Sequence, residues 1–599
     1  MAREGVRLET TSGLGARATL RRGLEISPQL VQGLGVTVLL ALLAATGRVV
    51  VPIAVQQTVD TGILTADGPD PGRVAGLVAL AAVALVLAGV CTALVNVRLF
   101  RSSESGLAQL RTVAFRRVHD LSLLTQGTER RGSLVSRVTS DVDTISLFVQ
   151  WGGIMLMVSV LQIGVATVLM VVYSWQLALV VWLAFLPLLL VLRPAQRRVS
   201  AAYAAVRART GAMLGAISEA VVGAETIRAY GVAGRTQRRI DAAVDATRRA
   251  QVRAQVRVAA VFSSGVLVAN LVLAAVVVVG TLLGVDERIT VGRLLAFLFL
   301  VQLFTGPVQM ATEILNELQN ALAGWRRVLG VIDTPAEVTD PEHGGVDSPR
   351  GPGTVELRAV CFAYPDGPRV LTDVDLTVPA RSRVAVVGAT GSGKTTLARL
   401  VTRLVDPAGG QVLLDGVDVR DLTLATLRSR VVLVPQEGFL FDGTIAENIG
   451  YGLRRIDGID LDQAATEAFS ALGLADWLAT MPDGVRAQVG QRGERLSAGE
   501  RQLVALARAH VADPDVLVLD EATSAVDPAT EVRIATALEQ LTAGRTTITI
   551  AHRLSTAEAA DSVVVVAAGR IVQVGPHREL VRQDGPYASM HAAWLAQTR

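Results

Sequence analysis

A glycine-rich segment in the second half of the chain has the residue types that bind phosphate. It follows the apolar run 384–387 and reads Gly388-Ala389-Thr390-Gly391-Ser392-Gly393-Lys394-Thr395-Thr396, which contains the pattern G-x-x-x-x-G-K-T. Between a predicted strand and a predicted helix, such glycines let successive amides turn toward phosphate oxygens. We therefore expect the whole segment to bind ATP, with Lys394 at the β- and γ-phosphates and Thr395 offering its hydroxyl to Mg²⁺.

Lys394 is also the only lysine in the chain, although lysine and arginine together number 57. A coding bias toward arginine would replace lysine wherever either cation serves. The surviving lysine therefore marks a position that requires a compact ammonium, as a phosphate site lined by backbone amides does.

Two adjacent acids give a second chemical signal. The apolar run 516–519 predicts a buried strand that ends in Asp520 and Glu521. We expect Asp520 to hold Mg²⁺ and Glu521 to orient or activate the attacking water. Such a strand is weak evidence alone, but it becomes strong when it follows a phosphate loop.

The segment just before this strand resembles a known motif. Leu496-Ser497-Ala498-Gly499-Glu500-Arg501-Gln502 resembles the signature of ABC transporters, and it stands in the family's order. In that family the signature of one ATPase domain completes the nucleotide site of another. The resemblance implies that three residues act on the partner's ATP: Ser497, Gly499 and Glu500.

Further positions match the family's motifs. Tyr364 resembles the aromatic residue that stacks on adenine, and Gln436 resembles the glutamine that senses Mg²⁺ and the attacking water. Asp527 resembles a residue of the loop that crosses the dimer interface, and His552 resembles the switch histidine at the γ-phosphate. The resemblance thus implies Glu521 and His552 as catalytic residues. It implies three oxygen ligands for Mg²⁺: Thr395, Gln436 and Asp520.

Two departures from the family pattern concern coupling. The usual Leu-Ser-Gly-Gly-Gln is here Leu-Ser-Ala-Gly-Glu, so that Glu500 adds negative charge near the partner's nucleotide. Gln491 stands where exporters of this family usually carry glutamate, in a loop that resembles the one communicating with the membrane helices. Neither change predicts an inactive enzyme.

The first half of the chain reads as a membrane domain. The chain is 51% hydrophobic, and six apolar runs precede residue 312. Each run approaches the length of ~20 residues that crosses a bilayer core. The runs are 36–55, 74–97, 152–173, 175–192, 259–283 and 294–311. A net charge of +3 gives no argument for nucleic acid, and two cysteines need no disulfide framework.

Arginine placement predicts the orientation. Eight arginines lie between 98 and 137 and thirteen between 193 and 257, whereas the opposite connections hold few. The positive-inside rule places both long segments, the ATPase domain and both termini in the cytoplasm of a multi-pass cell-membrane protein. We expect no cleavable signal peptide, because the first run begins late and is long enough to span.

The two arginine-rich segments read as helices continued beyond the bilayer. Each is interrupted by a short polar segment, at 126–129 and at 229–231. Such tips could contact a cytoplasmic partner domain; a solvated helical face is the alternative.

Arg48 lies inside the first apolar run, where a charge costs at least ~2.5 kcal/mol. One hypothesis is that it faces a water-filled cavity and recognises anionic or polar cargo. The alternative is a buried pair with an acid such as Asp60 or Glu313.

These observations predict a multidomain chain: an all-α transmembrane domain of six helices (1–333), a linker (334–353) and an α/β P-loop ABC ATPase domain (354–599). The layout resembles an exporter-type half-transporter that pairs with an identical or homologous subunit. We expect ATP-driven transport by alternating access, with export of a lipid, drug or peptide-like cargo. The alternatives are an importer of a siderophore-like cargo on the same fold and a non-transporting ABC ATPase.

Overall fold

The computed structural model describes residues 12–64, 68–122, 124, 131–341, 344–365, 367–520, 527–551 and 553–597. It divides into two compact units by internal contacts. One, called here the helical unit, comprises Thr10–Phe115 and Val135–Ile332. The other, the α/β unit, comprises Met1–Glu9, Arg116–Leu134 and Asp333–Arg599.

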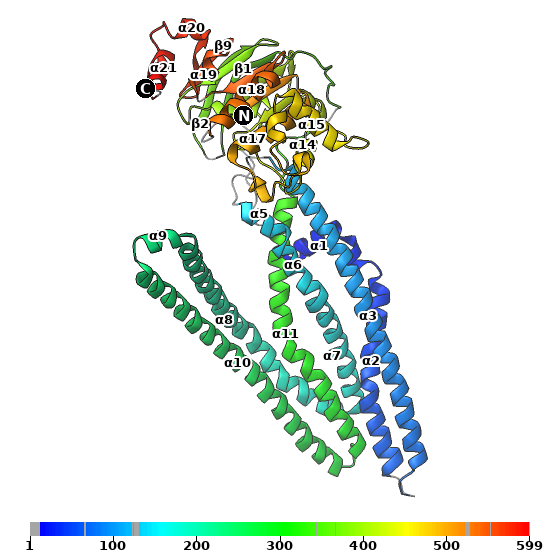
Figure 1. The fold of residues 1–599 in the computed structure, drawn as a ribbon. Coiled ribbons are helices and arrows are strands. Elements are labelled where there is room, and N and C mark those ends of the chain that lie inside the picture. The colour runs from blue at the N-terminus through cyan, green and yellow to red at the C-terminus, as the bar shows by residue number, and fades with distance from the viewer. Residues whose placement is uncertain are drawn as a thin grey trace. The chain divides into compact units, whose positions relative to one another are not determined.

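The helical unit is built from long helices that follow the apolar runs (Figure 1). Ser174 separates two of them because its Oγ accepts the amide hydrogen of Leu177 at 3.4 Å and so begins a new helix. The elements are α1 (Ala16–Ile26), η1 (Pro28–Val31), α2 (Leu34–Thr58), η2 (Val59–Ile63), α3 (Pro71–Asp120), α5 (Arg131–Val138), α6 (Ser140–Leu147), η3 (Phe148–Gly152), α7 (Gly153–Tyr173), α8 (Trp175–Val222), α9 (Ala224–Ala229), α10 (Ala233–Val285) and α11 (Val291–Ile332).

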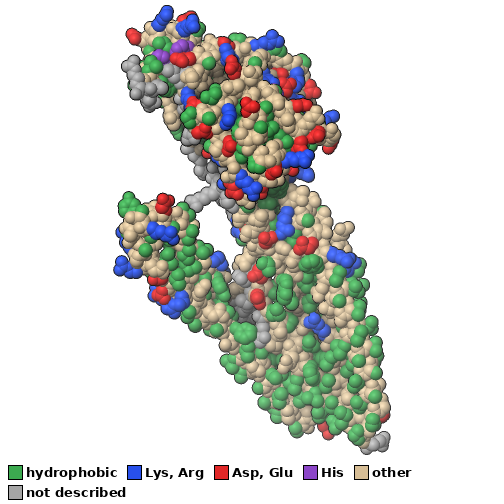
Figure 2. Space-filling model, in the orientation of Figure 1, with side chains coloured by type: hydrophobic (Ala, Val, Ile, Leu, Met, Phe, Trp, Pro, Cys, Tyr) green, Lys and Arg blue, Asp and Glu red, His purple; other side chains and the backbone are tan. Residues whose placement is uncertain are grey.

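Among the described residues, five helical stretches are long and apolar enough to cross a membrane: Pro28–Ile63, Pro71–Asp120, Leu134–Tyr173, Ala233–Val285 and Val291–Ile332. The fourth predicted run lies in α8, where the described apolar stretch is the shorter Trp175–Pro187. Many apolar side chains face outward on these helices, as Figure 2 shows. A surface of this kind is stable in lipid and not in water.

The helical unit packs around aromatic side chains from neighbouring helices. Phe185 of α8 and Phe304 of α11 are buried, and their ring centroids lie 5.2 Å apart at 61°. Trp182 contacts the same Phe304 ring edge-on at 5.2 Å. These contacts fix the half of α8 that carries the shortest apolar stretch against α11.

The helices α8 and α10 run side by side and are joined by α9 and a tight turn (Figure 1). Tyr230 and Gly231 form the turn, and Gly231 takes a φ of +63°. The side chains of Val222 and Tyr230 are 85% and 79% exposed at this tip. The predicted interruption at 229–231 is therefore confirmed, whereas the one at 126–129 lies outside the described residues.

The described residues of the α/β unit form two sheets. The first is antiparallel with strand order β2-β1-β4-β5, made of β1 (Val355–Ala363), β2 (Arg369–Val378), β4 (Gly409–Leu414) and β5 (Val417–Asp418). The second has the order β10-β9-β3-β8-β7-β6. It comprises β3 (Arg383–Val387), β6 (Val431–Val434), β7 (Val516–Asp520), β8 (Thr546–Ile550) and β9 (Ser562–Ala567), all parallel, and the antiparallel β10 (Arg570–Gly575).

Helices cover these sheets and form a second core. Trp477 and Phe469 are buried in this core. The helices are α12 (Lys394–Val401), α13 (Leu424–Arg430), α14 (Ile445–Gly450), α15 (Leu461–Ala471), α16 (Ala475–Leu478), η4 (Gly484–Arg486), η5 (Gln491–Gly493), α17 (Ala498–Ala512), α18 (Pro528–Thr542), α19 (Leu554–Glu558), α20 (His577–Leu580) and α21 (Pro586–Gln597).

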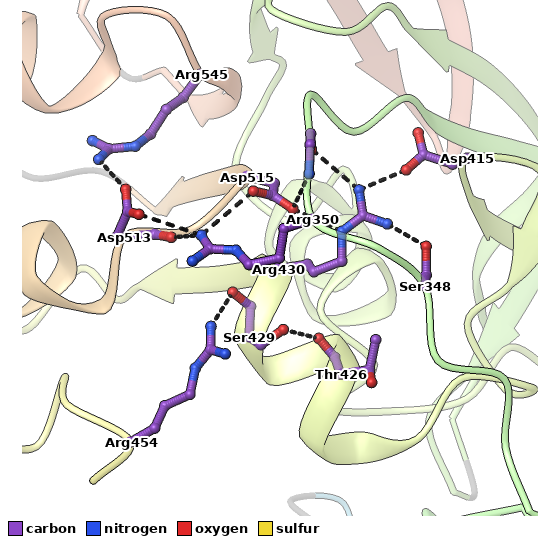
Figure 3. A network of polar contacts seen from close by, with 11 residues as sticks. Ser348, Arg350, Asp415, Thr426, Ser429, Arg430, Arg454, Asp513, Asp515 and Arg545 are labelled. Atoms are coloured by element: carbon purple, nitrogen blue, oxygen red, sulfur yellow. Dashed lines mark hydrogen bonds and ion pairs between the residues drawn. The ribbon is translucent and has the colours of Figure 1, made fainter.

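A buried arginine ties the segment before β1 to the sheet (Figure 3). Arg430 is 1% exposed, and its Nε donates to Asp515 Oδ2 at 2.7 Å. Its Nη2 donates to Asp415 Oδ2 at 2.6 Å and its Nη1 to Ser348 Oγ at 2.7 Å. Because all three donor groups are matched, the guanidinium is buried without an unpaired charge.

Candidate nucleotide site

The predicted site residues follow the ends of neighbouring parallel strands. In the ladder, Val386 of β3 pairs with Ile550 of β8, and Ile550 pairs with Asp520 of β7. Leu519 of β7 in turn pairs with Val434 of β6. Since the carboxyl ends of parallel strands meet at one edge, the phosphate loop, Asp520 and the segment after β6 come together there.

The glycines of the loop are required by its geometry. Gly388, Gly391 and Gly393 have φ values of +157°, +81° and +110°. A Cβ on Gly388 would lie 2.2 Å from the carbonyl oxygen of Val566, and one on Gly393 would lie 2.7 Å from Leu371 Cδ2. A Cβ built on Gly391 would have no heavy atom of the described residues outside its own turn within 4 Å, so that part of the structure leaves this side of the loop open.

Lys394 begins helix α12 and is 5% exposed. Its Nζ donates to the carbonyl oxygens of Gly388 at 2.7 Å and Ala389 at 3.0 Å. A compact ammonium fits inside this turn, whereas a planar guanidinium needs a wider site. The ammonium charge is thus held at the N-terminus of a helix, where anions bind.

The residues at this edge fit ATP and Mg²⁺ by their chemistry. Thr395 and Asp520 line one cavity of about 490 Å³, together with Pro435, the residue before Gln436. Hydroxyl, amide and carboxylate oxygens are the donors that Mg²⁺ prefers. Ser392 Oγ in the loop is buried and has no hydrogen-bond partner among the described residues, so a phosphate oxygen would satisfy it.

Tyr364 lies beside helix α12. Its hydroxyl is 3.0 Å from Thr396 Oγ1, and Arg399 Nη1 donates to it at 3.1 Å. The ring stands edge-on to Phe362, with centroids 5.1 Å apart. Arg399 is a further residue of this site; its spacing of three from Thr396 places the two on one helix face but does not indicate Tyr364 as its partner.

The signature segment caps helix α17. Ser497 Oγ accepts the amide hydrogen of Glu500 at 3.2 Å, and Glu500 Oε2 accepts the amide hydrogen of Ser497 at 2.8 Å. Trp477 Nε1 donates to the other carboxylate oxygen of Glu500 at 3.4 Å. Ser497 is exposed and Gly499 is buried. Glu500 therefore completes a reciprocal capping box, a role that glutamine also performs.

Two other predicted residues, Asp527 and Gln491, lie at the start of helical elements. Asp527 precedes α18, and its Oδ1 accepts the amide hydrogen of Thr530 at 3.0 Å, which holds the pKa of Asp527 below its usual range. Gln491 begins η5 and is exposed after Gly490, whose φ is +72°. Glu521 and His552 lie outside the described residues, as do 524–526.

Arg48 in α2 bonds to a neutral side chain rather than to an acid. Its Nη1 donates to Gln162 Oε1 at 2.9 Å, and Gln162 Nε2 donates to the carbonyl oxygen of Leu303 at 2.7 Å. Asp60 instead accepts hydrogen bonds from Thr290 Oγ1 and from the amide of Gly292. Gln162 is the partner that the described residues give Arg48, and the cargo role of Arg48 stays a prediction.

A second cavity of about 520 Å³ lies in the helical unit, where the predicted second and third spans meet their arginine-rich extension. Its wall is apolar and aromatic but includes one cation, Arg101, and two amides, Asn96 and Gln150. These residues include Phe100, Arg101, Gln150, Trp151, Ile154 and Met155. The side chains come from α3, η3 and α7.

Family models match both parts of the chain. The ABC transporter transmembrane region matches residues 34–308, and the ABC transporter ATPase model, described as "ABC transporter", matches residues 371–524. The two matches occur in the order that the sequence predicts.

Relatives match nearly the whole chain. The "Fatty acid ABC transporter ATP-binding/permease protein" of Mycobacterium tuberculosis is 35% identical, over 89% of this chain and 83% of its own length. The "ATP-dependent lipid A-core flippase" of Ralstonia nicotianae is 32% identical, over 95% of each. A solved bacterial Atm1-family ABC exporter with ATP bound is 29% identical, covers 96% of this chain and 98% of its own, and gives a TM-score of 0.79.

Proposed function

This chain belongs to the ABC transporter family, and we propose that it uses ATP hydrolysis to export an amphiphilic lipid with an anionic head group. Its helical membrane part and its α/β ATPase part are fused in one chain, as in the exporters that it matches. ATP binding, hydrolysis and ATP-driven export follow from the family. The cargo class, the subunit partner, the orientation and the residue roles below are proposals.

The cavity of about 520 Å³ in the helical unit carries the cargo proposal. Phe100, Trp151 and Ile154 offer an apolar wall for acyl chains, and Arg101 offers one cation for a carboxylate or phosphate. A drug-sized cation would meet no acid among the residues that line it. The names of the fatty acid transporter and the lipid flippase among the relatives support the same class.

Arg48 offers a second cation deeper in the membrane part. Gln162 holds its guanidinium by one hydrogen bond and leaves its charge unneutralised by any described acid. A charged side chain within a membrane-spanning segment generally indicates a substrate or ion pathway. We propose that an anionic head group passes from Arg101 toward Arg48 during transport.

ATPase stimulation by defined lipids tests the cargo class. The full chain is placed in nanodiscs of neutral lipid, and an acyl carboxylate, its methyl ester and an acyl amine are added in turn. The acyl carboxylate should stimulate hydrolysis most, and Arg101→Gln should raise the concentration needed for half-stimulation. Arg197→Gln, outside the cavity, is the control. Equal stimulation by the ester and the amine would exclude an anionic head group.

For hydrolysis we propose the following roles. Lys394 binds the β- and γ-phosphates inside the loop, and Tyr364 stacks on adenine. Thr395, Gln436 and Asp520 would hold Mg²⁺, which when bound would neutralise phosphate charge. Glu521 takes a proton from the attacking water, whose oxygen bonds to the γ-phosphorus as the bond to the ADP oxygen breaks. His552 donates to the departing γ-phosphate.

We propose that two copies of this chain form the transporter. Exporters of the half-transporter type work as dimers. In the proposed dimer, Ser497 and Gly499 of one subunit face the nucleotide of the other. The reciprocal capping box supports a homodimer, since Glu500 preserves the helix start that the usual glutamine would give. Nothing in this geometry requires a different partner with a stronger signature.

Mixed expression tests the pairing. Two differently tagged copies of the chain, expressed with no other transporter, should co-purify at equal amounts and hydrolyse ATP. A chain that stays monomeric or inactive until a second half-transporter is added would exclude the homodimer.

We further propose that two cytoplasmic parts of the long helices couple ATP hydrolysis to transport. One is the end of α3 near Arg117, and the other is the tip between α8 and α10. In the α/β unit, Arg117 of α3 donates from Nε and Nη2 to the carbonyl oxygen of Thr334 at 2.9 and 2.6 Å. This contact joins the helix end to the segment 334–353, which we propose as the linker. The exposed tip at Val222 and Tyr230 would dock on the ATPase domain of the partner subunit.

A further inference from the structure

Three side chains with metal-binding atoms converge near the C-terminal end of the α/β unit. Glu558 ends α19, His577 begins α20 and His591 lies in α21. Glu558 Oε1 is 3.8 Å from His577 Nε2 and 3.9 Å from His591 Nε2. The ligand atoms of all three residues lie within 4.8 Å of one another. Figure 1 shows the three helices together, and Figure 2 shows histidine side chains at the surface there.

A buried tyrosine holds one of the imidazoles in place. The hydroxyl of Tyr587 is 2.7 Å from His577 Nδ1, and its side chain is fully buried. Nδ1 is thereby engaged, and Nε2 of His577 is the ring nitrogen that faces Glu558. Metal-binding histidines regularly have such a partner on their second nitrogen, because it fixes the tautomer and the ring orientation.

The second imidazole, His591, lies on the helix that carries Tyr587, α21. Tyr587 and His591 are four residues apart on α21, so their side chains share one helix face. The rings of His577 and His591 lie with centroids 5.5 Å apart. Tyr587 and Leu580 belong to a buried cluster with Val563 and Val565, which anchors α20 and α21 to β9. The site is therefore built on packed elements.

We propose that Glu558, His577 and His591 bind one divalent transition-metal ion, with Zn²⁺ as the preferred occupant and water as a fourth ligand. Two imidazoles and a carboxylate are a donor set typical of Zn²⁺ sites with an open position. Mg²⁺ and Ca²⁺ prefer oxygen donors and would be poor occupants.

The distances permit this geometry after a small movement. Zn²⁺ bonds of ~2.0–2.1 Å place tetrahedral donor atoms about 3.3 Å apart. The separations of 3.8 and 3.9 Å from Glu558 require those donors to close by about half an ångström. The ligand atoms of the two histidines, within 4.8 Å of each other, must approach by at most about 1.5 Å. The side chains of His577 and His591 are 18% and 16% exposed and that of Glu558 is 46% exposed, so an ion can enter from solvent.

Zinc titration of the full chain tests the site. The protein carries an affinity tag without histidine, is stripped with a chelator and is titrated with Zn²⁺ against a chromogenic chelator in nanodiscs. One tight site per chain is expected. The double variant His577→Ala, His591→Ala should lose at least about tenfold in affinity, and so should Glu558→Gln. Glu579→Gln, which changes an acid of α20 outside the cluster, should bind like the natural chain.

A second measurement separates metal binding from a purely structural role of the histidines. Zn²⁺ should raise the Tm of the natural chain in a concentration-dependent manner and leave the Tm of the double variant unchanged. Lys394→Ala should keep the zinc site, because Lys394 belongs to the proposed nucleotide site and that site shares no residue with the zinc cluster. Zinc affinity and Tm shift that are equal in the natural chain and the double variant would overturn the proposal.

Discussion

The α/β unit and the helical unit place their functional groups by different means. In the α/β unit, the phosphate loop and Asp520 follow strand ends, and backbone geometry fixes them. In the helical unit, Arg48 is held by one side-chain bond to Gln162, within apolar helices. The first arrangement tolerates almost no change at its chemical groups. The second allows the cargo surface to vary while the fold persists.

The largest effect is expected at Lys394. Lys394→Ala should lower ATP hydrolysis about 10³-fold, because it removes the charge that meets the β- and γ-phosphates. Lys394→Arg should lose nearly as much, since the guanidinium does not fit between the carbonyls of Gly388 and Ala389. Arg570→Lys, at an exposed position of β10, is the control for exchanging the two cations. Steady-state ATPase rates in nanodiscs measure all three, and an active Lys394→Arg variant would contradict the account of the single lysine.

The next effect concerns stability of the α/β unit. Arg430→Ala should reduce the free energy of unfolding by about 3 kcal/mol, because it leaves Asp415 without its cation and Asp515 with only the 3.4 Å contact to Arg350. Arg358→Ala removes a 59% exposed partner of Glu356 and should cost less than about 1 kcal/mol. Urea denaturation followed by tryptophan fluorescence gives both values. Equal losses of unfolding free energy in the two variants would mean that the buried ion pairs of Arg430 contribute no more to stability than the exposed pair of Arg358.

A comparable substitution in the helical unit should leave hydrolysis intact. Gln162→Ala frees the Arg48 guanidinium and should change the lipid concentration for half-stimulation of ATPase about tenfold, the worth of one charge-assisted hydrogen bond. The unstimulated ATPase rate should stay within about twofold, because Gln162 is not part of the nucleotide site. A variant that loses unstimulated and stimulated hydrolysis together would show that Gln162 acts on the fold instead.

Exchanges at Glu500 examine the altered signature. Glu500→Gln should keep the ATPase rate within about threefold, since glutamine can accept the amide hydrogen of Ser497 as the carboxylate does. Glu500→Ala removes that cap and should cost about 1 kcal/mol of stability. A strong rise in rate for Glu500→Gln would show that the carboxylate charge, and not the cap, governs the site.

The smallest effect is a pH dependence at His510. Burial, and then the nearby charge of Arg545, lowers the pKa of His510 in the folded chain. The unfolded chain takes up this proton at its ordinary pKa of about 6.5, so stability falls as pH drops below that value. Tm measured between neutral pH and about pH 5.5 should fall less in His510→Gln than in the natural chain. Equal slopes would exclude this contribution.

Much of the nucleotide site was predictable because its signals are local. The pattern from Gly388 to Thr396 specifies both the turn and the helix that follows, and apolar runs located β3 and β7. The bond between Arg399 and Tyr364 was not predictable, because the residues come from separate elements. The capping box that Glu500 completes was predictable from the pattern Ser-x-x-Glu. The resemblance to the family signature draws attention instead to the negative charge of Glu500 near the partner's nucleotide.

The helical unit shows the limit of hydropathy. Hydropathy located the spans, but it gave no sign of the bond between Arg48 and Gln162, which joins helices far apart in the chain. It also missed the π-helical segments η2 and η3, which interrupt the helices at Val59–Ile63 and Phe148–Gly152. The convergence of Glu558, His577 and His591 likewise depends on tertiary packing that no local pattern encodes. Neither the roles of Glu521 and His552 nor the domain boundaries were tested, and they stay predictions.

Transport in inside-out membrane vesicles tests the central claim most directly. A fluorescently labelled acyl lipid with a carboxylate head group is added outside, with ATP and Mg²⁺, and its accumulation in the lumen-facing leaflet is followed. The account predicts ATP-dependent accumulation that Lys394→Ala abolishes at equal protein amount. Loss of preloaded lipid on ATP addition, or accumulation that persists in Lys394→Ala, would contradict ATP-driven export.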